Sequence, residues 1–152
     1  MAIQHMSLTE YRDYLEREHA LGAVLYCTFL HHTWSPDSST FKGMSTMRTI
    51  ERFHKRNRGA KEIMCNVYCA PDGTVYTGRS PREDNCACQA PPMGFPYARL
   101  PRSLRQLMEE KPGKFGSSNW RRWPNAYGFS VETIGNFDRE DPMTSKAMAT
   151  SL

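Results

Sequence analysis

The sequence predicts a fold of the α/β (α+β) class, in which helices pack on a central β-sheet. Residues 24–30 form an apolar, aromatic and β-branched run that is too short for a membrane span and has the length of a buried strand. Two segments, 7–19 and 44–55, repeat apolar residues at helical spacing. Two further β-favouring runs flank Pro71-Asp72-Gly73, which is a hairpin signal. Together these patterns favour one domain that contains both helices and strands.

Length and composition fit a single folded domain. A chain of 152 residues is long enough for one sizeable core, and 39% hydrophobic with 24% charged residues argues against disorder. Since no apolar run reaches the length of a transmembrane helix, we expect no membrane insertion. The first six residues have neither the basic start nor the apolar core of a secretory signal. We therefore expect synthesis in the cytoplasm.

The cysteine count and the net charge give only general indications of redox state and partner class. Five cysteines cannot all pair, and their spacing is unlike a small secreted disulfide framework, so we expect mostly free thiols. A net charge of +4 favours anionic partners, a class that includes the bacterial cell wall as well as nucleic acid.

The first helix is predicted over residues 7–19, because Ser7 and Glu10 match a capping box and Gly22 follows as a stop. The strand of residues 24–30 comes next, and a polar turn-forming loop leads out of it. The second helix is predicted over residues 44–55. Its inward positions are Met44, Met47, Ile50 and Phe53.

The hairpin is predicted from residues 63–70 and 74–79. Between 80 and 125, frequent proline and glycine exclude long regular elements, apart from a short helix near 101–110. Residues 127–134 are predicted as a strand that ends at Gly135-Asn136. Asp141-Pro142 then has the N-cap and first-turn proline of a last helix.

Two histidines, His31 and His32, stand where the first strand run ends. A strand interior is rigid and its end is open, so polar side chains there are held firmly and still reach a ligand. The alternative is that both are ordinary core or rim histidines. His31 is therefore a candidate for chemistry, not an assignment.

The order of these pieces resembles the type 2 N-acetylmuramoyl-L-alanine amidases, the zinc enzymes of phage endolysins and bacterial autolysins, whose fold is shared by peptidoglycan recognition proteins. The matching motifs are His31-His32-Thr33, the run from Pro71 to Arg79, and Gly135-Asn136-Phe137-Asp138. The resemblance covers about residues 24–152. It implies a mixed central sheet flanked by helices, with residues 1–22 as an N-terminal helical extension and 23–152 as the amidase-like domain.

The resemblance implies that His31 is the first of three protein ligands to a catalytic zinc. Neutral imidazole is a good zinc ligand, and three protein ligands leave a fourth position for water, whose pKa the metal lowers. The implied reaction is hydrolysis of the amide between N-acetylmuramic acid and L-alanine in peptidoglycan.

The sequence departs from the family in its later part. No histidine follows His54, and the sequence stops within the helix predicted from Asp141, so the family's C-terminal zinc-ligand segment has no match in it. We expect either a fragment of a family member or an incomplete metal site. We therefore expect weak zinc binding, slow or absent hydrolysis, and self-association through an uncovered apolar face. Cys86 and Cys88 are candidate replacement ligands because thiolates bind zinc readily; the alternative is a loop thiol pair without a metal.

Two further candidate site residues, Cys65 and Arg79, also follow from the resemblance. Cys65 stands where many members have a tyrosine beside the zinc-bound water, which makes it a candidate catalytic residue; the alternative is an ordinary buried thiol. Arg79 takes the place of an arginine that braces the cleft floor. For Arg79, a salt bridge with Glu132 or Asp138 is the alternative to substrate contact.

Three more residues are candidates for substrate binding. Thr33 and Trp34 follow the histidines, and the Trp34 ring suits stacking on a sugar. Asn66, at the start of the hairpin, is expected to shape the cleft with Arg79.

Two other functions stay open. A domain of the same fold that binds peptidoglycan without cleaving it is the first alternative. A nucleic-acid-binding protein is the remote one, based on arginines and tryptophans between residues 99 and 123, where acidic residues dilute the positive charge.

Overall fold

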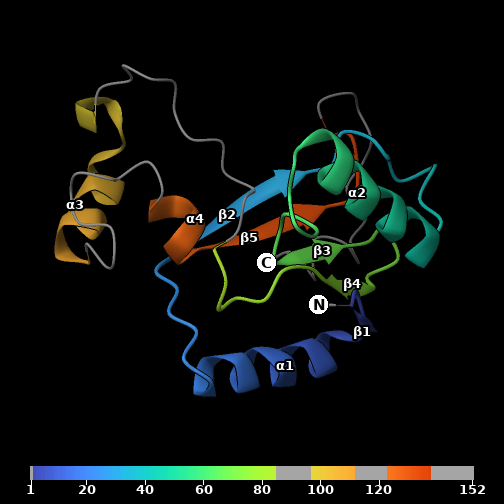
Figure 1. Cartoon of the computed structure of the whole chain (residues 1–152), viewed down its shortest axis with the longest axis horizontal. Helices are drawn as coiled ribbons and strands as arrows, with labels where there is room; N and C mark the ends of the chain where they lie inside the picture. Colours follow the sequence, from blue (N-terminus) through green and yellow to red (C-terminus); the bar gives the residue numbers. More distant parts are fainter. Residues whose placement is uncertain (1, 85–96, 112–122, 138–152) are drawn as a thin grey trace.

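A five-stranded mixed β-sheet with helices on both faces forms the centre of the protein (Figure 1). The computed structural model describes residues 2–84, 97–111 and 123–137. The elements in chain order are β1 (His5–Met6), α1 (Leu8–Ala20), β2 (Cys27–His32), α2 (Met44–Asn57), β3 (Val67–Cys69), β4 (Val75–Thr77), a 3₁₀ turn (Tyr97–Arg99), α3 (Arg102–Glu110), α4 (Trp123–Tyr127) and β5 (Gly128–Thr133). The predicted fold class is confirmed.

The strands lie in the order β1-β4-β3-β5-β2. β3 and β4 form the predicted antiparallel hairpin, and Gly73 in its turn has φ +86°, a conformation that favours glycine. β5 lies parallel to both β3 and β2, so the C-terminal ends of these three strands share one edge of the sheet. β1 adds antiparallel to β4; with two residues it is too short to leave a pattern in the sequence.

Helix α1 forms as predicted. The Ser7 hydroxyl accepts the Glu10 N–H at 3.3 Å, and the Glu10 carboxylate accepts the Ser7 N–H at 2.8 Å, which completes the capping box. Tyr11 and Tyr14 are buried on one side of the helix. They form one hydrophobic cluster with residues of β3, β4 and β5, namely Val67, Cys69, Val75 and Val131.

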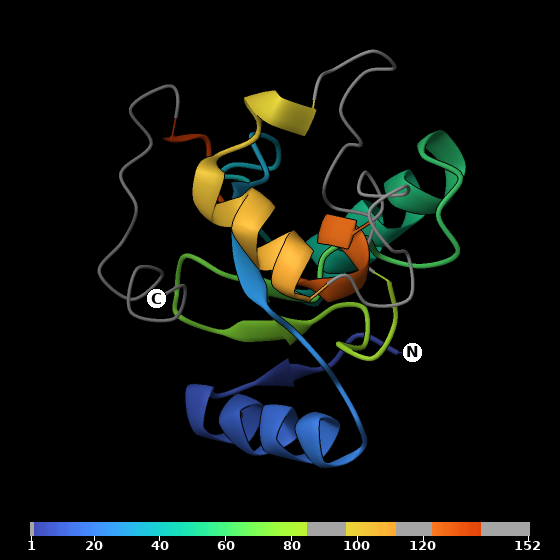
Figure 2. The ribbon, with the colours of Figure 1, turned by 90° about the vertical axis from the view of Figure 1, so that its left-hand side faces the viewer.

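Helix α2 covers the opposite face of the sheet (Figure 2), where its Met47 and Ile50 are buried. The cluster there also contains Ile63, Cys65, Tyr68, Ala70, Tyr76 and Ile134. Phe53, predicted to point inward, is 48% exposed, with the Arg58 guanidinium 5.8 Å from its ring centroid. The prediction for Phe53 was wrong because its neighbour His54 occupies the inner side of this turn.

The other elements agree in part. α3 and β5 occupy the predicted segments, while α4 was not predicted. The helix expected from Asp141 lies outside the described residues. Cys27, Cys65 and Cys69 are free thiols, and Cys86 and Cys88 fall in a range that is not described. Of the helices described, none combines the length and apolar character needed to cross a membrane.

Candidate functional site

Three polar side chains, one each from β2, β5 and β3, lie on the face of the sheet that α2 covers. In the strand register His31 of β2 is opposite Glu132 of β5, and Glu132 is opposite Tyr68 of β3. Residues paired in this way share a face, with neighbouring strands about 4.8 Å apart. His31, Glu132 and Tyr68 therefore form a row across three strands, which we call the β2–β5–β3 row.

The imidazole of His31 has an unsatisfied atom. Its Nε2 is buried and has no hydrogen-bond partner among the residues that the structure describes. A buried polar atom without a partner is unfavourable, so this nitrogen fits a ligand such as a metal ion. In the same described ranges, neither around His31 nor elsewhere do three His, Cys, Asp or Glu side chains gather closely enough to hold a metal. His31 is thus a candidate for one ligand of a larger set.

Cys65 connects with the β2–β5–β3 row through Glu132. Its thiol donates to Glu132 Oε2 at 2.7 Å, and its backbone N–H donates to the Tyr68 hydroxyl at 3.2 Å. Burial, and next the negative charge of Glu132, raise the pKa of the Cys65 thiol well above its usual value. The thiol is therefore protonated at neutral pH and acts as a donor, not as a nucleophile.

Glu132 is the residue that sequence reasoning missed, because it considered Glu132 only as a partner for Arg79. The signal was a carboxylate inside a predicted strand, between Val131 and Thr133. Its significance depends on the β2–β5 register, which places it beside His31. Nothing in the local sequence gives that register.

The turn after β2 is held against Gly135. The Thr33 hydroxyl donates to the Pro36 carbonyl at 2.6 Å and accepts the Gly135 N–H at 3.1 Å. The Trp34 N–H donates to the Gly135 carbonyl at 3.0 Å. Trp34 has φ +57°, which is uncommon for a residue with a side chain, and is 55% exposed. The fold thus presents the indole to solvent three residues beyond His31.

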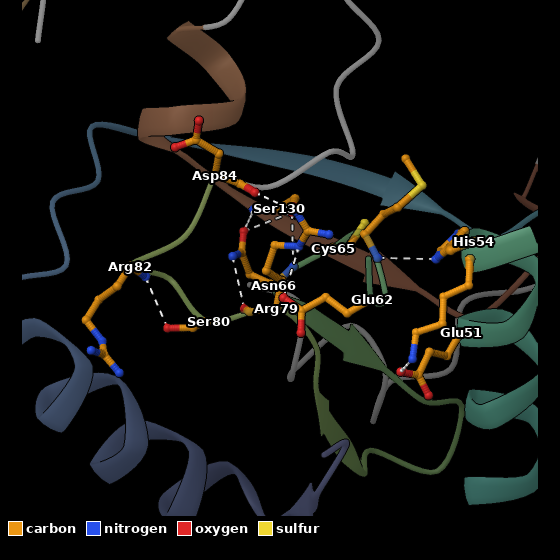
Figure 3. A network of polar contacts seen from close by, with 12 residues as sticks. Glu51, His54, Glu62, Cys65, Asn66, Arg79, Ser80, Arg82, Asp84 and Ser130 are labelled. Atoms are coloured by element: carbon orange, nitrogen blue, oxygen red, sulfur yellow. Dashed lines mark hydrogen bonds and ion pairs between the residues drawn. The ribbon is translucent and has the colours of Figure 1, made fainter. Parts of the chain in front are cut away.

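Asn66 is an internal brace (Figure 3). Its side-chain oxygen accepts the Ser130 N–H at 2.8 Å and the Ser130 hydroxyl at 2.9 Å, and its amide donates to the Arg79 carbonyl at 3.2 Å. The residue is only 2% exposed. These bonds join the start of β3 to β5 and to the segment after β4. A role for Asn66 in contacting substrate stays a prediction.

Arg79 is also held from inside. Its Nε lies 3.3 Å from Glu62 Oε1, and its Nη1 donates to the Asp84 carbonyl at 2.8 Å. Glu62 is thus an acidic partner that the sequence reasoning did not consider. Asp138, one of the two partners that it did consider, lies outside the described residues. Substrate contact by Arg79 stays a prediction.

Two hollows of the described surface lie elsewhere. One of about 390 Å³ lies between α1 and the start of β2, and one of about 530 Å³ lies beside β1. Neither is lined by His31 or Glu132. The β2–β5–β3 row therefore stands out by its chemistry and not by its shape.

Comparisons with known proteins support the fold. No protein-family model matches the sequence, and no curated protein matches it either. Among solved structures the chain is similar to wild-type Drosophila PGRP-LB, a peptidoglycan recognition protein, with a TM-score of 0.52 and 17% sequence identity. The match covers 98% of this chain and 60% of that one. The fold is that of the peptidoglycan recognition proteins and related amidases, a mixed five-stranded sheet flanked by helices.

Proposed function

We propose that this protein is a zinc-dependent hydrolase of peptidoglycan that cleaves the amide between N-acetylmuramic acid and L-alanine, in cell-wall lysis or remodelling of the endolysin or autolysin kind. The observation that carries the proposal is the pair of His31, near the end of β2, and Glu132, on the adjacent strand β5. A buried imidazole nitrogen without a described partner stands opposite a carboxylate. The fold that holds this pair is shared with a peptidoglycan recognition protein.

The residues fit zinc in part. Nε2 of His31 is the ligand atom that the described residues offer. Cys86 and Cys88, outside those residues, are the candidates for completing the set, since thiolate binds zinc readily. Zinc, when bound, supplies a Lewis acid that polarises the amide carbonyl and promotes attack by water.

Glu132 is the candidate general base. Its Oε2 accepts the Cys65 thiol, which leaves Oε1 to take a proton from an attacking water. Its position opposite His31 would place this proton acceptor next to the ligand nitrogen. The general base and the metal ligand would thus come from adjacent parallel strands.

Binding of the glycan is assigned to Trp34. The exposed indole has an apolar face that suits stacking on a sugar ring. Thr33 supports this role indirectly, because its hydroxyl is used in holding the turn. Asn66 and Arg79 support the strands from inside.

The test is a release assay on purified peptidoglycan that counts new L-alanine amino termini, with and without chelator. We expect slow, chelator-sensitive release that is lost in His31→Ala and retained in His19→Ala, since His19 is exposed on α1. Release that is insensitive to the chelator, or that is retained in His31→Ala, would contradict the proposal. Binding to peptidoglycan without any release would favour the non-catalytic binding domain.

A further inference from the structure

We propose that Cys65 is a positioning residue whose thiol holds one oxygen of Glu132, so that the other oxygen is presented beside His31. The inference rests on the proposed function, because it assigns Cys65 a task in the same site. It gives a specific role to a buried thiol that would otherwise be ordinary core.

The backbone of Cys65 is fixed by its surroundings. The backbone N–H donates to the Tyr68 hydroxyl at 3.2 Å, and the carbonyl accepts the Arg79 N–H at 2.9 Å. Gly78 packs so closely that a Cβ there would lie 1.9 Å from the Cys65 carbonyl oxygen. Tyr68 itself is fully buried. The thiol therefore approaches Glu132 from a rigid support, which is what precise positioning needs.

The contact suits a carboxylate that must be held in one orientation. A glutamate has several rotatable bonds, and ordering them in the reactive geometry is entropically unfavourable. The S–H···O contact of 2.7 Å from Cys65 orders the Glu132 carboxylate in the ground state. A thiol has a single proton to donate, so this contact restrains the carboxylate through one oxygen only.

Cys69, at the end of β3, provides a matched control four residues further along the chain. It is as buried as Cys65 but belongs to the hydrophobic cluster under α1, on the opposite face of the sheet. Truncation of either cysteine to alanine removes one buried sulfur. Only the Cys65 change removes the donor to Glu132.

The first measurement is the infrared S–H stretch of the whole chain. The difference between the parent and Cys65→Ala isolates the Cys65 band, and Cys69→Ala isolates that of Cys69. Glu132→Gln should move the Cys65 band to higher frequency, because a neutral amide accepts a hydrogen bond more weakly than a carboxylate. A Cys65 band that does not respond to Glu132→Gln overturns the inference.

The second measurement adds zinc, with binding followed by a competing chromophoric chelator. If Glu132 stands beside the metal, zinc should shift the Cys65 band in the parent and leave it in place in His31→Ala. Zinc that binds without moving this band overturns the inference alone. Failure of zinc to bind overturns the proposed function, and the positioning role falls with it. The hydrogen bond between Cys65 and Glu132 is tested separately, by the response of the Cys65 band to Glu132→Gln.

The third measurement is the rate of amide release. Cys65→Ala should lower kcat about tenfold with KM little changed, a factor that corresponds to one hydrogen bond to a charged group. Cys65→Ser should restore most of the rate because it keeps a donor, and Cys69→Ala should keep the parent rate. Equal losses in Cys65→Ala and Cys69→Ala would assign Cys65 to the core only. If Cys65→Ala does not fold, Cys65→Ser replaces it as the reference that lacks the Cys65 S–H band, and the response of that band to Glu132→Gln decides.

Discussion

Two buried polar residues on opposite faces of the sheet, Glu18 and His31, differ in how their polar atoms are satisfied. Under α1, Glu18 is 6% exposed, yet its Oε2 accepts the Ser80 hydroxyl at 2.6 Å and Arg82 Nε at 3.0 Å. Under α2, His31 Nε2 is buried without such a partner in the described chain. A satisfied network is a brace, and an unsatisfied atom beside a carboxylate marks a place where a ligand would be stabilising.

The position of β2 in the sheet explains why the candidate site lies there. β2 is an edge strand, and α1 lies nearest to β1 and β4, at the other side of the sheet (Figure 1). Side chains in the middle of the sheet are enclosed by helices and neighbouring strands. Those of β2 border one strand only, so His31 can be held by β5 and remain open to a ligand.

The largest stability loss is expected where a buried brace is removed from the sheet itself. Asn66→Ala deletes three side-chain hydrogen bonds and leaves the Ser130 N–H without its Oδ1 acceptor. We expect the free energy of unfolding to fall by about 3 kcal/mol. Urea unfolding measures this, and Asn57→Ala, at the exposed end of α2, is the control. A loss no greater than in Asn57→Ala would show that Asn66 is not a brace.

On the α1 face, Glu18→Ala should lower the free energy of unfolding by about 2 kcal/mol. The loss is smaller than for a fully buried ion pair because the Arg82 side chain is 43% exposed and can be hydrated. Glu18→Gln keeps an acceptor for Ser80 and should lose about half as much.

The pH dependence checks the same brace. Burial alone would raise the pKa of Glu18, but hydrogen bonds from Arg82 and Ser80 outweigh it and lower the pKa. The stabilisation is present above the unfolded-state pKa of the carboxyl and is lost as the pH falls through the lower folded-state pKa. Thermal unfolding scans should therefore show a smaller acid-induced loss in Glu18→Gln than in the parent. Equal losses would place the acid sensitivity elsewhere.

On the α2 face the pH sensor is His54, whose Nδ1 accepts the Met64 N–H at 3.2 Å (Figure 3). Burial, and next the charges of Arg58 and Arg79, lower the pKa of His54. Because the folded state then favours the neutral ring, stability is full above the unfolded-state pKa and decreases as the pH falls below it. His54→Gln should cost about 1 kcal/mol at neutral pH and flatten the decrease in unfolding temperature between neutral and mildly acidic pH. His19→Ala, on the exposed side of α1, should leave that decrease unchanged.

Much of the fold was predictable because its signals are local. Ser7 with Glu10, the apolar spacing of α2, and Asp72-Gly73 each specify an element from neighbouring residues. Phe53 shows the limit of such patterns, since it continues the apolar spacing of α2 and yet is 48% exposed. β1 and α4 were missed because segments of two and five residues are stabilised by their neighbours and not by their own pattern.

The site was predictable only where it coincides with a strand end. His31, Thr33 and Trp34 could be chosen because they follow an apolar run. The prediction that this run is a buried strand was wrong, since it forms the edge strand β2 and Leu30 is 64% exposed. Glu132 could not, because its role depends on pairing across about one hundred residues of sequence. The internal contacts of Asn66 and Arg79 likewise depend on which segments meet in space.

The smallest stability effect, with the opposite sign, is expected at Trp34, which neither cluster holds. Its φ of +57° is unfavourable for a residue with a Cβ and costs little for glycine. Trp34→Gly should therefore raise the free energy of unfolding by about 0.5 kcal/mol, because the relieved strain slightly exceeds the extra entropy of glycine in the unfolded chain. Trp34→Ala keeps the strain and should show no such gain.

Both variants should bind purified peptidoglycan more weakly in a pull-down assay, since each removes the exposed indole. Leu21→Ala removes an apolar side chain of similar exposure on the α1 side and should bind like the parent. A glycine variant that gains stability while losing binding would show that the indole of Trp34 serves binding and not stability. A variant that binds like the parent would leave Trp34 as a turn residue only and would move the sugar contact to another part of the chain.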